Sequence, residues 1–154
     1  FMERTLRQCQ AAPMTGTADT VITNGSCMCG GVRFHVTGPI RNVLQCHCVR
    51  CRKFTGNFTA ASGALSCDIS FESDKTLQWF NPADDANVGF GFCAACGSSL
   101  FWKLADEEAG YWSIHAGAFD NAVGLSTEAI WYADHAAEYT ALDPTPPHIN
   151  AADL

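Results

Sequence analysis

Alternation of apolar and polar side chains is the clearest pattern along this chain. In residues 31–36, Val32, Phe34 and Val36 fall on one face and Arg33 and His35 on the other, which is the period of a half-buried β-strand. The same period recurs in residues 88–92, 100–104 and 112–116, and strand-forming or aromatic residues are dense in residues 58–65, 77–80 and 128–132. These segments predict a mainly β fold.

Turn-forming pairs separate the predicted strands. They are Asn24-Gly25, Gly38-Pro39, Asn81-Pro82 and Asp120-Asn121. A helical stripe sustained over three turns is missing from the sequence, although residues 48–54 and 133–139 are compatible with short helical turns. The pattern therefore predicts antiparallel β-sheet with few short helical turns.

The length of 154 residues is that of one domain with its own core. We expect an N-terminal tail over residues 1–18, the domain over residues 19–142 and a C-terminal surface tail over residues 143–154, where three prolines occur and little is apolar. The chain lacks an apolar run of the roughly 18 residues that a membrane helix needs. Its first residues also lack the apolar region of a secretory signal. We expect a cytoplasmic protein without a membrane partner.

Charge disfavours a nucleic-acid partner. The formal net charge is −7, and the nine basic residues are scattered along the chain rather than gathered into a stripe that can neutralise phosphates. The densest positive patch, Arg50 to Lys53, lies inside a group of cysteines. That position favours a role with a small anion.

Cysteine usage changes the picture most. The nine cysteines are Cys9, Cys27, Cys29, Cys46, Cys48, Cys51, Cys67, Cys93 and Cys96. An odd count without an export signal is not typical of a disulfide framework, and cysteines two residues apart make a strained disulfide. Thiolates spaced this closely repel one another unless a cation lies among them. The spacing therefore predicts bound metal in a reducing compartment.

Seven of the cysteines form three clusters, and zinc accounts best for their number. Zinc takes four protein ligands in a structural site, and three plus an open position in a catalytic one. The pairs Cys27/Cys29 and Cys93/Cys96 are distant in sequence and each is followed by a glycine, which suits a knuckle turn that joins two hairpins. Cys46, Cys48 and Cys51 lie within six residues and supply three thiolates. We predict two zinc ions for each chain, one structural and one catalytic.

Other roles for the clusters remain open from the residues alone. The thiols can simply pack in a core, or ligate an iron–sulfur cluster, although their spacing does not match the ferredoxin patterns. Cys93 and Cys96 have the spacing of a redox pair, which needs a βαβ setting that the pattern lacks. A single structural zinc with a labile second ion is a further alternative.

An open three-thiolate site suits chemistry at sulfur. Such a zinc ion is a poorer Lewis acid than one held by three histidines but accepts a fourth, exogenous thiolate. We therefore predict Cys46, Cys48 and Cys51 as the catalytic residues and a small thiol as substrate. Arg52 and Lys53 can bind the carboxylates of such a thiol, or can belong to a solvated turn.

The motifs GSCMCGGVRFHVTGP, LQCHCVRCRKFTG and FGFCAACGSSLF resemble the glutathione-dependent formaldehyde-activating family, also called the GFA or CENP-V domain. The resemblance covers about residues 24–132. It implies an Mss4-like β fold, a structural zinc on Cys27, Cys29, Cys93 and Cys96, and a second zinc on the three-cysteine group. It also implies a carbon–sulfur lyase activity in which glutathione adds to formaldehyde to give S-hydroxymethylglutathione.

Some residues depart from the family pattern or lie outside it. The family often has a tryptophan near the end of the domain, where this chain has Glu138 and Tyr139. Cys9 and Cys67 we interpret as incidental. His47 stands between two predicted ligands, so its side chain is expected to point away from the metal. His115 lies on the polar face of a predicted strand and is our third candidate for substrate binding, as an acid or base, beside the alternative of a structural histidine.

Two functions compete at this point. The first is a zinc-dependent lyase or synthase that acts on adducts of a glutathione-like thiol with formaldehyde or another small aldehyde. The second is a non-catalytic zinc module that braces the fold or presents a surface to a protein partner. The open thiolate position and the neighbouring basic pair favour the enzyme, and a homodimer is compatible with either function.

Overall fold

The computed structural model describes residues 21–104, 110–121 and 124–154. Within them β-strands dominate, and a single α-helix occurs, α2 (Val49–Thr55). The first sheet has three antiparallel strands in the order β1 (Ile22–Ser26), β2 (Val32–Thr37) and β5 (Ile69–Asp74). Short 3-10 turns at residues 66–68, 116–118, 133–135 and 151–153 complete the helical content. The mainly β fold with few helical turns is confirmed.

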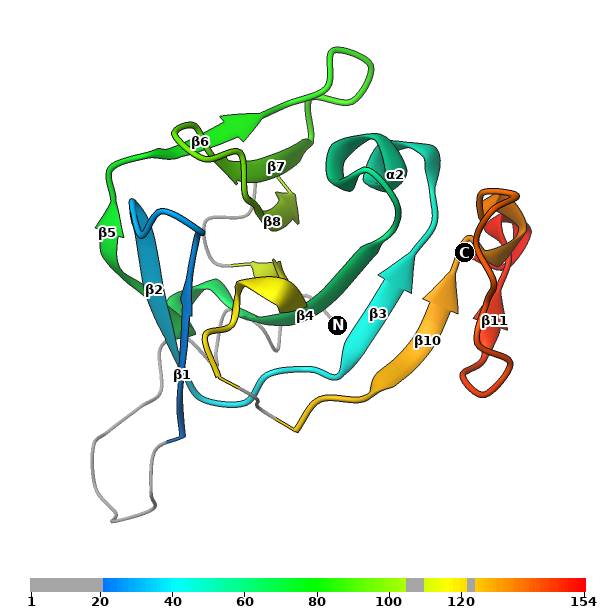
Figure 1. Cartoon of the computed structure of the whole chain (residues 1–154), viewed down its shortest axis with the longest axis horizontal. Helices are drawn as coiled ribbons and strands as arrows, with labels where there is room; N and C mark the ends of the chain where they lie inside the picture. The colour runs from blue at the N-terminus through cyan, green and yellow to red at the C-terminus, as the bar shows by residue number, and fades with distance from the viewer. Residues whose placement is uncertain (1–20, 105–109, 122–123) are drawn as a thin grey trace.

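The second sheet has eight strands in the order β11-β10-β3-β4-β9-β8-β7-β6 (Figure 1). Its members are β3 (Val43–Cys46), β4 (Thr59–Leu65), β6 (Leu77–Phe80), β7 (Val88–Cys93), β8 (Ser99–Leu104), β9 (Tyr111–His115), β10 (Thr127–Trp131) and β11 (His148–Ile149). In the run β3-β4-β9-β8-β7-β6, each strand pairs antiparallel with the next. This long sheet carries most of the features discussed below.

Strand direction differs from the prediction at one end of this sheet. β10 pairs parallel with β3 and also parallel with β11, so the sheet is mixed rather than antiparallel throughout. A parallel neighbour requires a long crossover connection, and here the chain from β4 to β9 supplies it. Alternation of side chains reports which face is buried but carries no information about the direction of a neighbouring strand.

The C-terminal segment also differs from the expected surface tail. β11 extends the sheet at its edge, where the Ile130 N–H donates to the Pro147 carbonyl at 2.9 Å. The Ala151 N–H in turn donates to the Asp134 carboxylate at 2.9 Å. Proline lacks an N–H, which an edge strand tolerates because only one side of the strand is paired. Residues 147–151 therefore pack against the domain.

The hydrophobic core lies between the small sheet and one face of the large sheet. Phe34 of β2 meets Phe101 of β8 edge-on, with ring centroids 5.0 Å apart, and both side chains are almost completely buried. Ile114 of β9 joins them. The next residues along these strands, Trp102 and Ser113, face the opposite side, which is where the cavity described below lies. In the described part of the chain, no helix has the length and apolar character of a membrane-spanning segment.

Candidate functional site

Four cysteines converge where the small sheet meets the large one. The Sγ atoms of Cys27, Cys29, Cys93 and Cys96, which we call the four-cysteine cluster, all lie within 4.8 Å of one another. Cys29 Sγ is 3.6 Å from Cys27 Sγ and 3.7 Å from Cys93 Sγ. Sulfurs bound to one tetrahedral zinc at about 2.3 Å lie roughly 3.8 Å apart. The geometry fits a closed zinc site without rearrangement.

Two similar knuckle turns build this cluster. In the first, the Gly30 N–H donates to the Cys27 carbonyl at 3.0 Å, and in the second the Gly97 N–H donates to the Cys93 carbonyl at 2.8 Å. The φ angles of Gly30 and Gly97 are 73° and 75°, a left-handed conformation that favours glycine. The glycine after each cysteine pair is thus required by the turn, as the sequence predicted.

Hydrogen bonds from outside the cluster reach at least two of its sulfurs. The Val32 N–H donates to Cys27 Sγ at 3.2 Å, and Ser98 Oγ lies 3.2 Å from Cys96 Sγ. The hydroxyl and backbone N–H of Ser98 lower the pKa of Cys96 to about 5. Such donors orient ligands and stabilise the charge that a bound cation shares.

The three-cysteine cluster, made of Cys46, Cys48 and Cys51, lies at the junction of β3 and α2. Cys46 ends β3, Cys48 caps the helix by accepting the Cys51 N–H at 3.4 Å, and the three Sγ atoms lie within 4.8 Å of one another. Hydrogen bonds from Cys46 and Cys51 lower the pKa of Cys48 to about 2, whereas its neighbours raise the pKa of Cys46. The thiolate of Cys48 is thus favoured, whereas ionisation of Cys46 is disfavoured. A bound cation is needed to ionise all three, so the donor set fits a metal ion.

The three-cysteine cluster faces a cavity of about 360 Å³, which we call the cluster cavity. Six consecutive strands of the large sheet contribute to its wall, because the sheet curls around it (Figure 1). The lining residues from these strands include Leu44, Ala61, Ser113, Trp102, Phe90 and Trp131. The volume suits a small organic ligand. Three sulfurs at the wall of such a space leave room for a further group beside a bound ion.

Ion pairs fix one margin of the cluster cavity. Arg50, in the first turn of α2, donates to Asp85 at 2.8 Å and to Asp84 at 2.9 Å. Arg50 and Asp85 both line the cavity. These bonds tie the loop between β6 and β7 to the helix that carries Cys51, and they neutralise the charge of Arg50.

The basic residues predicted to bind substrate lie away from the cluster cavity. Lys53 is exposed, and Arg52 donates to the His135 carbonyl at 3.4 Å. Neither side chain is among those that line the cavity. Their role stays a prediction. The arginines that do line it are Arg41 and Arg50.

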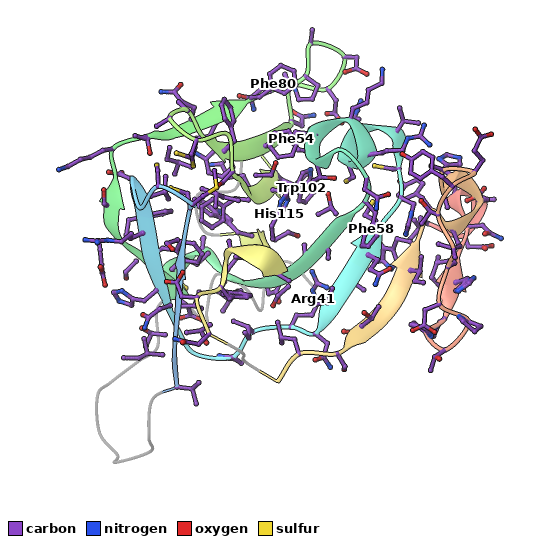
Figure 2. The ribbon with its side chains drawn as sticks, viewed as in Figure 1. Arg41, Phe54, Phe58, Phe80, Trp102 and His115 are labelled. Carbon is purple, nitrogen blue, oxygen red and sulfur yellow. The ribbon has the colours of Figure 1, made fainter. Side chains whose placement is uncertain are left out.

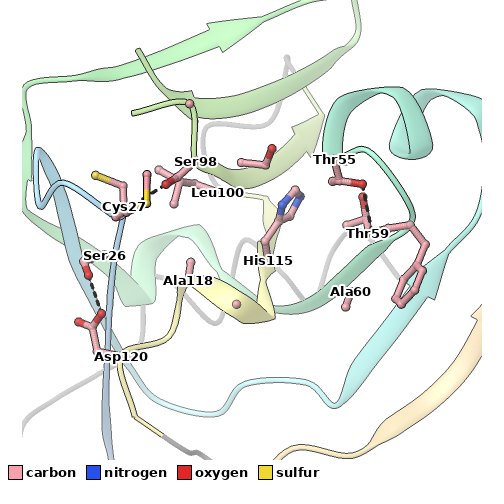
Figure 3. A pocket seen from close by; sticks show the side chains of 15 residues that line it. Ser26, Cys27, Thr55, Thr59, Ala60, Ser98, Leu100, His115, Ala118 and Asp120 are labelled. Atoms are coloured by element: carbon pink, nitrogen blue, oxygen red, sulfur yellow. Dashed lines mark hydrogen bonds between the residues drawn. The ribbon is translucent and has the colours of Figure 1, made fainter. Parts of the chain in front are cut away.

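His115 lines a second cavity of about 700 Å³ (Figure 3). This residue is 7% exposed, and its ring packs edge-on to Phe54 at 6.0 Å between centroids. Figure 3 shows it facing the side of Thr55 and Thr59, and Thr59 lines both cavities. His115 itself is not among the described residues that line the cluster cavity.

Burial of His115 makes stability depend on pH. Burial lowers the pKa of this imidazole from 6.5 to about 4. The unfolded chain then binds more protons than the folded one as the pH falls from 6.5 to 4, so stability is present above this window and is lost through it. Between pH 7 and 5 we expect His115→Gln to remove about 2 kcal/mol of the pH dependence of unfolding. Urea titrations at both pH values measure it, and parallel profiles for the two proteins would contradict it.

The other residues discussed from the sequence are not among the described residues that line the cluster cavity. His47 is 2% exposed, stacks on Phe58 at 4.9 Å and is not among the residues that line the cavity. Cys67 lies in the 3-10 turn at residues 66–68, and Cys9 lies outside the described residues. Tyr139 is 70% exposed, and the cavity wall near the end of the domain is supplied by Trp131 and Tyr132 instead.

Tyr132 is a functional candidate that the sequence analysis missed. It lines the cluster cavity and has φ 55° and ψ 44°, the only positive φ of a non-glycine residue in the described part of the chain. Burial raises the pKa of its phenol, and the three cysteines add to that effect. A strained tyrosine beside a thiolate cluster marks a place where side-chain orientation matters. Only the backbone reveals this signal.

The family model described as glutathione-dependent formaldehyde-activating enzyme, GFA, matches residues 22–135, which is most of the chain. The chain belongs to this family. The match includes both cysteine clusters. Among solved structures, a crystal structure of a Rhodobacter sphaeroides protein has 18% identity and a TM-score of 0.52, covering 64% of this chain and 89% of that one. At this identity the GFA chain shares a fold with that protein. A search of curated proteins gives no match.

Proposed function

We propose that this GFA protein is a zinc-dependent carbon–sulfur lyase or synthase that interconverts a glutathione-like thiol and a small aldehyde with their S-hydroxyalkyl adduct. The observation that carries the proposal is the three-cysteine cluster at the wall of the cluster cavity. The four-cysteine cluster has a full set of ligands for a structural zinc, whereas this one has three ligands and space beside them. The family match supplies glutathione and formaldehyde as the first substrates to test.

Zinc bound by Cys46, Cys48 and Cys51 would stabilise a substrate thiol as its thiolate and leave a position for the sulfur. The overall reaction forms a bond between the thiol sulfur and the carbonyl carbon of formaldehyde. The carbonyl oxygen takes up the proton that the thiol loses, so the product is the S-hydroxymethyl adduct without any other reactant. The reverse direction is the lyase reaction.

The cavity walls assist in two ways. Leu44, Trp102 and Trp131 are apolar and limit water around the reacting groups. The Tyr132 hydroxyl is a hydrogen-bond donor on the same wall, and we assign it to the aldehyde oxygen, where negative charge develops as the carbon–sulfur bond forms. Tyr132→Phe is expected to lower kcat about tenfold to a hundredfold with little change in KM for the thiol, as measured by steady-state kinetics. An unchanged kcat would remove Tyr132 from the mechanism.

Metal analysis and adduct formation test the proposal together. We expect about two zinc ions per chain, and faster exchange between free formaldehyde and S-hydroxymethylglutathione in the presence of the protein, measured by magnetisation-transfer NMR. In protein reconstituted with cobalt, glutathione should also alter the visible absorption, because a new thiolate changes the ligand field.

The controls separate catalysis from simple zinc binding. The uncatalysed exchange at the same thiol and aldehyde concentrations gives the baseline, and zinc-loaded Cys51→Ser protein controls for adventitious metal. The proposed enzymatic function would be rejected by three results together. The wild-type protein would carry two zinc ions, fail to accelerate exchange of any thiol–aldehyde pair, and show no change in cobalt absorption on addition of thiols.

A further inference from the structure

Arg41 is a second arginine in the cluster cavity, and the surrounding backbone holds it in place. Its N–H donates to the Gly63 carbonyl at 2.9 Å, and its own carbonyl accepts the Ser62 hydroxyl at 2.5 Å. These bonds join the segment before β3 to β4. The Arg41 backbone is therefore part of the cavity wall rather than of a free loop.

The guanidinium of Arg41 is oriented by neutral groups. Nη1 donates to the Asn42 carbonyl at 3.0 Å and Nη2 to the Ser62 carbonyl at 3.1 Å. It also contacts the Tyr111 hydroxyl, which opposes the rise that burial causes in the pKa of Tyr111. A guanidinium has five N–H donors, so donors remain for a ligand. The group is thus held in one orientation before a ligand binds.

Arg41 differs from Arg50 in its charge balance. Arg50 bonds two aspartates, whereas none of the four ion pairs found among the described residues includes Arg41. A positive charge at the wall of a largely apolar cavity favours an anionic ligand there. Of the two arginines that line this cavity among the described residues, Arg41 is the one available to an anionic ligand.

The distance from Arg41 to the sulfurs limits the ligand. Arg41 precedes β3 and Cys46 ends it, so at about 3.3 Å per residue their Cα atoms are at most about 16 Å apart. Arg41 lies near the start of β3, and α2, which carries Cys51, follows the other end of that strand (Figures 1 and 2). A ligand that reaches both groups carries its anion at a distance from its sulfur.

We propose that Arg41 binds a carboxylate of the thiol substrate at the end of the cluster cavity away from the three-cysteine cluster. The inference rests on the proposed function and assigns the residue that recognises a carboxylate of the thiol away from its sulfur. Arg41 is accordingly a specificity residue that contacts substrate but not the reacting atoms.

The test compares acid and ester forms of one ligand. S-methylglutathione has no thiol to place on a metal, so its binding, measured by calorimetry, reports the carboxylate site separately from catalysis. We expect Arg41→Gln to weaken S-methylglutathione binding tenfold to a hundredfold and to leave the binding of its dimethyl ester unchanged. Glutathione and its dimethyl ester should show the same contrast in kcat/KM.

Two further variants make the comparison decisive. Arg33→Gln removes an arginine charge from the three-stranded sheet, where Arg33 pairs with Glu72 at 3.6 Å. This variant should bind S-methylglutathione like the wild type. Arg41→Lys keeps the positive charge but loses the paired N–H donors of the guanidinium, so it should retain part of the preference for the acid over the ester. This variant keeps the test usable even if Arg41→Gln folds poorly. Thermal melting checks the folding of each variant.

The outcomes separate this inference from the proposed function. Equal losses for acid and ester, a preference unchanged in Arg41→Gln, or a wild type that does not bind S-methylglutathione would overturn the role of Arg41. A wild type that binds S-methylglutathione through Arg41 but catalyses no thiol–aldehyde exchange would keep the carboxylate site and reject the enzyme.

Discussion

Cys96→Ser is expected to release one zinc ion and to abolish the cooperative unfolding transition. The four-cysteine cluster joins the turn after β1 to the turn between β7 and β8, so it connects the two sheets across the core. Structural zinc contributes about 10–16 kcal/mol in small zinc domains, whereas a domain is stable by about 5–15 kcal/mol in total. Loss of one ligand therefore removes a share of stability comparable to the whole.

Zinc content by mass spectrometry and thermal melting by circular dichroism measure this prediction. Met28→Ser is the matched control, because Met28 lies between two ligands but is 83% exposed and should retain both metal and melting temperature. A Cys96→Ser protein that keeps full zinc and an unchanged melting temperature would show that the cluster has no structural ion.

Side-chain alternation was sufficient to predict the strands that have one buried face. β2, with Val32, Phe34 and Val36 buried, is the clearest case. In β8 and β9 consecutive residues are buried, Leu100 with Phe101 and Ile114 with His115, so the alternation of the sequence located these strands without reporting their burial. β3, with the sequence VLQC, is half-buried at every position and therefore has no alternation to detect. β1, with the sequence ITNGS, has weak strand formers, and its pairing with β2 overrides that preference.

The candidate site also has a part that could be predicted from the sequence and a part that could not. The two cysteine groups could be predicted from the sequence because spacing within each turn is a local property, and the groups that spacing predicted are the two that the structure brings together. The cavity is not local. Arg41 and Tyr132 reach it only because β10 lies beside β3 and the sheet curls, which are long-range features that no short motif reports.

The predicted basic pair shows the limit of reasoning from neighbours in sequence. Arg52 and Lys53 adjoin Cys51, but the helix turns their side chains away from the cavity that Cys51 lines. Successive residues on a helix point about 100° apart, so adjacency to a ligand does not place a side chain beside it. Arg41 is ten residues before Cys51 in the sequence, yet it lines the cavity.

Cys51→Ser is expected to remove the second zinc ion and at least a hundredfold of kcat/KM while leaving the fold intact. Substitutions behind metal ligands already cost tenfold to a hundredfold, so the loss of a ligand itself should cost more. The fold should persist because β3 and α2 are held by other bonds, including the Thr55 hydroxyl to the Cys51 carbonyl at 2.9 Å, which serine preserves. The four-cysteine cluster is untouched by this change.

Zinc content, circular dichroism and exchange kinetics on one preparation measure this second prediction. Val49→Ala is the matched control, because Val49 lies on the same helix between two ligands, is 44% exposed and should keep both metal and activity. A Cys51→Ser protein as unfolded as Cys96→Ser would mean that both clusters are structural. Full activity with one zinc ion would place the chemistry away from the three-cysteine cluster. Retained fold with lost activity is the result that only a closed structural site and an open catalytic site together explain.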